Sequence, residues 1–144
     1  MKILYIIGSL TTAGAEKLLL EAIPLLVQKG MEVDLLVLNG YQYPYMKQLQ
    51  QLKCSNIYSL GRGPLLNPLH IFRVIPYLVK YDLVHVHLFP ALYWVVFAKI
   101  FGFSRTKLVF TEHSTSNRRI QNKGFKYIER FIYSFYTKII CITE

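Results

Sequence analysis

Charged residues are scarce in this chain of 144 residues: they make up 17% of it, and only eight residues are acidic. Hydrophobic residues account for 53%, which excludes a disordered chain, and aromatic residues account for 15%. Low charge with many aromatics indicates apolar surface that a membrane, a partner domain or a lipid-like ligand covers. A chain of this length fits one domain, which buries about 70% of its unfolded surface.

Cysteine and long apolar runs are also rare. Cys54 and Cys141 both have apolar or strand-like neighbours, which is typical of buried free thiols in a reducing compartment. No export-type cleavage site precedes Glu16, and the longest apolar stretch, residues 88–98, is far shorter than the ~20 residues of a membrane span. We therefore expect a cytoplasmic protein, with peripheral attachment to the inner face of the cell membrane as one option.

Positive charge is unevenly distributed along a chain whose formal net charge is +9. Between residues 105 and 138 there are only two acids, Glu112 and Glu129, against eight bases. The bases are Arg105, Lys107, Arg118, Arg119, Lys123, Lys126, Arg130 and Lys138. Such a cluster attracts phosphates, whether of a nucleic acid, an anionic lipid or a nucleotide sugar. Because no RNA-binding signature or zinc-knuckle spacing accompanies it, we do not expect nucleic acid as a partner.

Apolar runs of strand length alternate with segments of helical period. The predicted strands are residues 3–7, 33–38, 57–60, 83–87, 108–111 and 139–142, and the predicted helices are residues 15–29, 45–52, 68–81, 91–101 and 125–136. Pro24 and Pro76 fall inside two of these helices, where we expect a kink or an early start. Continuously hydrophobic strands with helices between them predict an α/β fold: a Rossmann-like, doubly wound parallel sheet with helices on both faces, in a single domain.

Ligands of such sheets bind at the carboxyl ends of the strands, which here are residues 8–14, 39–44, 87–90 and 112–122. The first of these, in "GSLTTAGAEKLLL", has neither the dinucleotide-binding spacing nor a P-loop lysine. Gly14 would open a helix whose free N–H groups can meet an anion, and its missing side chain lets a ligand come close. An ordinary strand-to-helix turn explains the pattern equally well.

Histidines mark two other strand ends. His85 and His87 alternate in "DLVHVHLF" and therefore share a face, and His113 follows Glu112. We interpret His85 as a core histidine with satisfied hydrogen bonds, whereas His87 and His113 can donate to a bound hydroxyl or phosphate. A zinc site is disfavoured because its ligands would lie on two strand ends without a third anchor. We expect neither a metal ion nor a cofactor.

The last predicted helix, which includes "RFIYSFY", is aromatic on almost every side. A core helix is the favoured interpretation. The competing one is an interfacial helix that brings Lys123, Lys126 and Arg130 to lipid headgroups.

Four segments together resemble the N-terminal half of family 4 glycosyltransferases. They are, in order, "MKILYIIGSLTTAGAEKLLLEAIPLLVQKGMEVDLLVL", "YDLVHVHLF", "LVFTEHSTSNRR" and "KIICITE", and the match runs from residue 1 to residue 144. The resemblance implies a retaining enzyme of the GT-B type, in which two Rossmann-like domains face each other across a cleft. This chain would be the acceptor-side domain, and its glycine-containing loop after the first strand would line the cleft.

The resemblance also implies roles for individual residues. His113 matches a histidine that faces the transferred sugar, which makes it the catalytic candidate. Gly14, His87, Arg118 and Arg119 match positions near the substrate, although Ala13 stands where many relatives have a second glycine. The expected substrates are a nucleotide-sugar donor and a glycan or lipid-linked acceptor.

One feature of the family is missing from this sequence. The family's paired donor-binding glutamates lie in its C-terminal domain, and the chain stops at "CITE". We therefore expect residues 1–144 to need that domain or a partner subunit, and to be inactive alone. The competing hypothesis is a non-catalytic module that binds a membrane or a partner through its basic aromatic helix.

Overall fold

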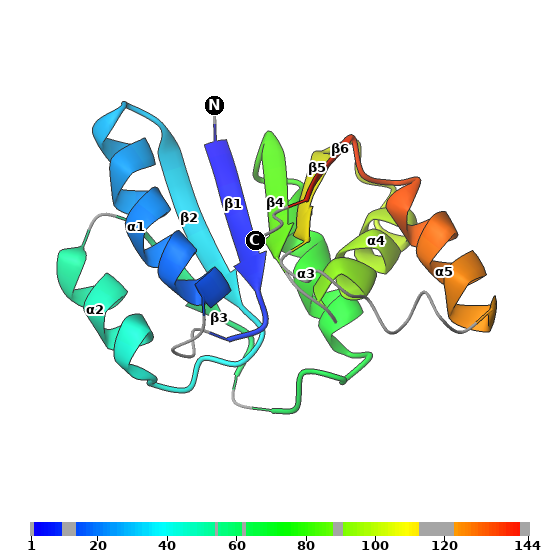
Figure 1. Cartoon of the computed structure of the whole chain (residues 1–144), viewed down its shortest axis with the longest axis horizontal. Helices are drawn as coiled ribbons and strands as arrows, with labels where there is room; N and C mark the ends of the chain where they lie inside the picture. The colour runs from blue at the N-terminus through cyan, green and yellow to red at the C-terminus, as the bar shows by residue number, and fades with distance from the viewer. Residues whose placement is uncertain are drawn as a thin grey trace.

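The computed structural model describes residues 2–9, 14–53, 55–61, 63–87, 91–112 and 123–141. Strands and helices alternate strictly along the chain, as Figure 1 shows. Their bounds are β1 (Lys2–Ile7), α1 (Gly14–Gln28), β2 (Glu32–Val37), α2 (Pro44–Leu52), β3 (Ile57–Ser59), α3 (His70–Leu78), β4 (Leu83–His87), α4 (Ala91–Phe101), β5 (Lys107–Glu112), α5 (Lys123–Tyr133) and β6 (Lys138–Cys141).

The strands form one parallel sheet in the order β3-β2-β1-β4-β5-β6. The chain first builds outward from β1 to β3, then crosses back and continues from β4 to β6. The order therefore reverses between β1 and β4, which are paired with Ile6 opposite Val86. This is the doubly wound, Rossmann-like arrangement that the alternating pattern predicts.

β1 and β2 contribute alternate residues to two separate cores. On one face, Tyr5, Ile7 and Leu35 pack under Leu19 of α1 and Leu49 of α2. On the other face, α3, α4 and α5 cover a larger core (Figure 1). Its central members are Leu4, Ile6, Leu36, Val84, Val86, Leu108 and Phe110 from the sheet, with Val74, Val95 and Ile132 from the helices. Because both faces are covered, the strands read as continuous apolar runs.

The bounds of α3 and α5 differ from the prediction by more than one residue. α3 begins at His70 rather than residue 68, because Asn67 Oδ1 accepts a hydrogen bond from Leu69 N and forms a turn there. It ends at Leu78 rather than residue 81. α5 lies two to three residues earlier than predicted and ends before Tyr136, whose ring turns back into the core. Pro24 and Pro76 lie within helices that continue past them.

The side chains of Cys54 and Cys141 are outside the described structure, so their burial stays a prediction.

None of the helices described in these ranges combines the length and the hydropathy needed to cross a bilayer.

Candidate functional site at the carboxyl edge of the sheet

The candidate site lies where the strand order reverses, at the carboxyl ends of β1 and β4. Gly14 begins α1, so the amino end of this helix is turned toward that edge (Figure 1). Gly8 directly follows β1, and its carbonyl accepts a hydrogen bond from Asn39 N at 2.8 Å. A Cβ at Gly8 would come within 3.0 Å of Leu65 Cδ1. A side chain at position 8 would therefore require the Leu65 side chain to shift.

His85 and His87 share a face, as their alternation predicts, and their rings stack 4.3 Å apart. Tyr5 of the neighbouring strand completes the stack, with its ring centroid 4.9 Å from that of His85 and 5.4 Å from that of His87. Burial raises the pKa of the Tyr5 phenol, so the phenol stays neutral to a higher pH than an exposed tyrosine would. The stack is on the α1 face of the sheet, where Tyr5 packs with Leu19.

The two histidines have different surroundings. His85 is half-buried, and its Nε2 lies 2.6 Å from Thr111 Oγ1 on β5, which agrees with a core histidine whose hydrogen bonds are satisfied. His87 ends β4 and is only 1% exposed, so its ring is covered although its backbone reaches the carboxyl edge. A contact between His87 and a substrate therefore stays a prediction.

The other predicted site residues follow β5. The backbone of β5 runs beside β4, with Thr111 opposite His87, and ends at Glu112. His113 is the next residue along the chain, but it lies outside the described residues, as do Arg118 and Arg119. Their roles stay predictions.

Sequence reasoning missed three residues that shape this edge. Tyr5 and Thr111 contact the histidines from neighbouring strands, and Glu16 in the first turn of α1 is buried. A carboxylate near the amino end of a helix is stabilised by the helix dipole. The apolar context of Tyr5 was visible in the sequence, but its contact with His85 depends on strand register.

The basic residues proposed for a membrane surface lie on α5, whose two sides differ. Ile132 faces the core, and Glu129 is 2% exposed and accepts a hydrogen bond from Tyr93 Oη at 2.7 Å. On the outer side, Lys126 and Arg130 are exposed. Three large apolar side chains of the helix are exposed as well: Tyr127, Ile128 and Phe131. A core helix, the favoured prediction, thus describes only one side of α5. The side chain of Lys123, in its first turn, is not described.

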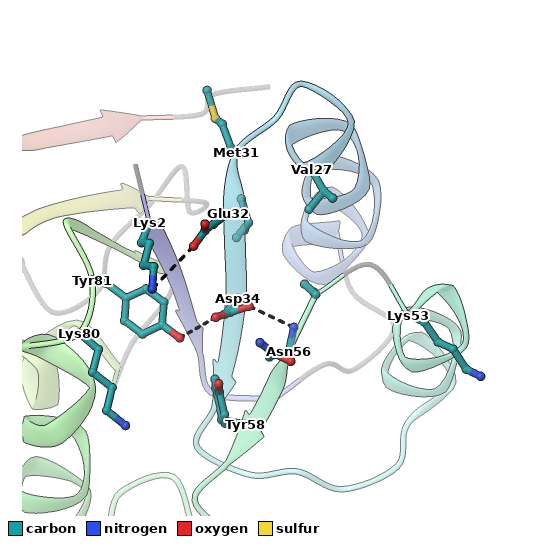
Figure 2. Close-up of a pocket in the computed structure, with 12 residues that line it drawn as sticks. Lys2, Val27, Met31, Glu32, Asp34, Lys53, Asn56, Tyr58, Lys80 and Tyr81 are labelled. Atoms are coloured by element: carbon teal, nitrogen blue, oxygen red, sulfur yellow. Dashed lines mark hydrogen bonds and ion pairs between the residues drawn. The ribbon is translucent and has the colours of Figure 1, made fainter.

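A polar cavity of about 690 Å³ opens at the opposite, amino edge of the sheet, and none of the predicted site residues lines it (Figure 2). Asp34 accepts hydrogen bonds from Tyr81 Oη at 2.7 Å and Asn56 N at 3.1 Å. Burial and the Asp34 carboxylate raise the pKa of Tyr81 far above its usual range. Lys53 and Lys80 point away from Asp34 in the same view. The Asp34 carboxylate at the centre of this cavity is thus already hydrogen-bonded to neighbouring groups of the protein.

No group of three or more His, Cys, Asp or Glu side chains in the described part of the chain could hold a metal ion.

Comparison with known proteins decides the family. The model of Glycosyltransferase Family 4 matches residues 12–144. The chain belongs to this family. The resemblance seen in its sequence motifs is thereby confirmed, over nearly the whole chain. No curated protein sequence matches the chain.

Solved structures confirm the fold of this family 4 domain. HepE of Anabaena in complex with UDP superposes with a TM-score of 0.67 and 20% identity, over 96% of this chain and 37% of HepE. HepE with UDP and glucose gives the same TM-score at 19% identity, again over 96% of this chain and 37% of HepE. The apo lipopolysaccharide outer core galactosyltransferase WaaB also gives 0.67, at 12% identity, over 96% of this chain and 38% of WaaB. The chain therefore spans less than two fifths of the length of these structures.

Proposed function

We propose that this family 4 domain is the acceptor-side half of a retaining glycosyltransferase. The enzyme would transfer a sugar from a nucleotide-sugar donor to a glycan or lipid-linked acceptor, as in polysaccharide biosynthesis. The match to the family over residues 12–144 carries this proposal. Two similar structures support it: HepE was solved with UDP and with UDP and glucose, and WaaB is a galactosyltransferase.

Substrates would bind at the carboxyl edge of the sheet. We propose that His113 contacts the reacting sugar. It directly follows Glu112, the last residue of β5, and β5 is paired with β4. Gly14 opens α1 at this edge, where free N–H groups favour an anion such as a phosphate. His87 at the end of β4 is a further candidate for substrate binding, and Arg118 and Arg119 would add positive charge for a phosphate or an acceptor.

The complete site would need a second domain. Paired donor-binding glutamates are a feature of the family's C-terminal domain, and the chain spans 37% of HepE. We propose that this domain, on the same polypeptide or on a partner subunit, faces the carboxyl edge. Residues 1–144 by themselves are then expected to catalyse neither transfer nor donor hydrolysis.

The experiment is to assay residues 1–144 alone and after addition of the C-terminal half encoded downstream or by a neighbouring gene. Transfer of sugar from a nucleotide donor is expected only in the mixture. Isothermal titration of residues 1–144 with common nucleotide sugars should give weak binding or none. Micromolar binding would show that the donor site has been assigned to the wrong domain.

A binding module is the second candidate function, and the outer side of α5 is the observation that favours it. Tyr127, Ile128 and Phe131 are exposed there beside Lys126 and Arg130. Aromatic and basic side chains on one side of a helix suit the headgroup region of an anionic membrane. Peripheral attachment on the cytoplasmic face through Lys123, Lys126 and Arg130 is compatible with either function. If the mixture with the C-terminal half is inactive, the non-catalytic module becomes the better account.

A further inference from the structure

The turn between α4 and β5 exposes a large aromatic side chain. Phe103 is 91% exposed, the highest value among the exposed large hydrophobic residues. Its φ of 50° lies in the left-handed region, which residues with a bulky side chain rarely adopt. The preceding residue, Gly102, could adopt a left-handed conformation easily, but its φ is not positive. A Cβ at Gly102 would collide with Ile75 and with the carbonyl of Ala98.

The exposure of Phe103 is not the result of a loose end, because hydrogen bonds hold the turn from both sides. Phe103 N donates to Ile100 O at 3.3 Å, and Ser104 N donates to Lys99 O at 3.1 Å. Lys99 Nζ then donates to Thr106 O at 2.7 Å, and the Thr106 hydroxyl donates to Leu78 O. The fold thus keeps an unfavourable backbone conformation that holds an aromatic ring in solvent. The two backbone hydrogen bonds of the turn form a Schellman motif, the common helix ending that has a left-handed residue, and this motif fixes the exposed position of the ring.

Beside Phe103 runs an apolar groove of about 600 Å³ between the turn and the end of α5. Ile100, Phe131 and Phe135 line it, and the rings of Phe131 and Phe135 meet edge to face at 5.1 Å. Phe131 is itself half exposed. Phe103 and the groove therefore form one apolar surface, which we call the Phe103 surface.

Basic residues lie on the elements that form this surface or directly follow them. Arg105 lines the groove, Lys107 and Lys138 begin β5 and β6, and Arg130 is on α5; all four are exposed. Among the side chains described for residues 83–141 the only carboxylate is Glu129, which is buried against Tyr93. Asp82, directly before β4, is an acid at the same amino edge, where it accepts a hydrogen bond from Lys2 N at 2.8 Å. An apolar centre with more bases than acids around it is complementary to an anionic bilayer, with acyl chains below and phosphates at the level of the bases.

We propose that the Phe103 surface docks onto an anionic membrane and that Phe103 inserts below the lipid headgroups. This inference deepens the proposed membrane attachment and rests on it. It moves the centre of the contact from the start of α5 to the α4–β5 turn. Since that turn leads into the first residue of β5, the contact lies toward the amino edge of the sheet. The carboxyl edge, with the candidate site, is left open to a second domain and to substrates.

The test is co-sedimentation of residues 1–144 with vesicles of phosphatidylglycerol and phosphatidylcholine. Phe103→Ser should weaken partitioning about tenfold, because it removes the apolar side chain that leaves water on binding. Leu25→Ser is the matched control, since Leu25 is also exposed but lies on α1, on the other face of the sheet. Its binding should equal that of the unchanged chain, and circular dichroism should show that both variants are folded.

A second variant reports insertion directly. The new indole in Phe103→Trp should add fluorescence, and brominated acyl chains in anionic vesicles should quench it. The new indole in Leu25→Trp should also add fluorescence, but the brominated chains should not quench it. If the unchanged chain binds no vesicles, both the proposed membrane attachment and this inference are wrong. If it binds but Phe103→Ser binds equally well and Phe103→Trp is not quenched, only this inference is wrong. If Phe103→Ser converts a dimer to a monomer without affecting vesicle binding, the surface joins two copies of the chain and the inference is also overturned.

Discussion

The Nε2 atom of His85 lies 2.6 Å from the hydroxyl oxygen of Thr111, and this contact joins β4 to β5 through their side chains. Thr111 is buried, and its Cα is paired with that of His87. This hydrogen bond thus ties His85, a member of the Tyr5–His85–His87 stack, to the strand that leads to His113.

We expect Thr111→Val to lower the free energy of unfolding by about 1–3 kcal/mol, because it leaves a partly buried imidazole nitrogen without this partner. Thr137→Val is the control, since Thr137 is exposed. Urea denaturation of both variants measures the difference. If the two lose equal stability, the His85–Thr111 hydrogen bond contributes nothing specific.

Tyr136 gives the protein a pH-dependent contribution to stability at alkaline pH. Its buried hydroxyl donates to Leu92 O at 2.7 Å, and burial, with a contribution from Tyr133, raises the pKa of Tyr136 well above its usual range. The unfolded phenol ionises at a pKa of about 10. The contribution is therefore complete below pH ~10 and is lost as the pH rises toward the higher pKa of the folded state.

We expect Tyr136→Phe to cost about 1 kcal/mol near neutral pH and to flatten the fall in stability above pH ~10. Tyr127→Phe should change neither, because Tyr127 is 72% exposed. Denaturation curves between pH 7 and pH 11, about one unit above the unfolded pKa, measure both effects. An unchanged alkaline slope in Tyr136→Phe would assign the pH dependence to other groups.

His113 is the residue on which the proposed catalysis depends most. In the complete enzyme, His113→Ala should lower turnover by about 100-fold or more, the effect of removing one positioned polar group. Thermal unfolding should barely change. A variant that unfolds readily, while its folded fraction keeps normal specific activity, would instead mark His113 as a structural residue.

Charge reversal at the start of α5 tests the basic membrane surface. Lys123→Glu together with Lys126→Glu should reduce co-sedimentation with anionic vesicles, because each base near the headgroups contributes about 1 kcal/mol. High salt should release the unchanged chain, since screening acts over about 8 Å already at physiological ionic strength. Equal binding to neutral vesicles would contradict an electrostatic contact.

Lys17→Glu with Lys29→Glu is the matched charge control. Both lysines are exposed, one in α1 and one just after it, on the opposite face of the sheet. The total charge changes by the same amount in both double variants. Only the position of the charge should therefore decide vesicle binding.

Segments that depend on local pattern were predictable. The run "KILYII" had to be buried on both sides, and every strand was predicted to within about one residue because its apolar run ends at a polar or turn residue. α3 was predicted to start two residues too early, because the Asn67 turn is a local hydrogen bond that competes with the helix.

Contacts that depend on register and packing could be seen only in the tertiary structure. Nothing in the sequence places Thr111 beside His85, 26 positions earlier, because that pairing follows from the order and alignment of the strands. The sequence also could not show which side of α5 faces solvent, since a helix with aromatics on almost every side has no single apolar stripe. Phe103 follows Gly102, and local propensity would assign the left-handed turn to the glycine. Position 102 needs a glycine for another reason, because a Cβ there would meet Ile75 and the Ala98 carbonyl. The helix-ending hydrogen bonds of Phe103 N and Ser104 N put the left-handed conformation at Phe103.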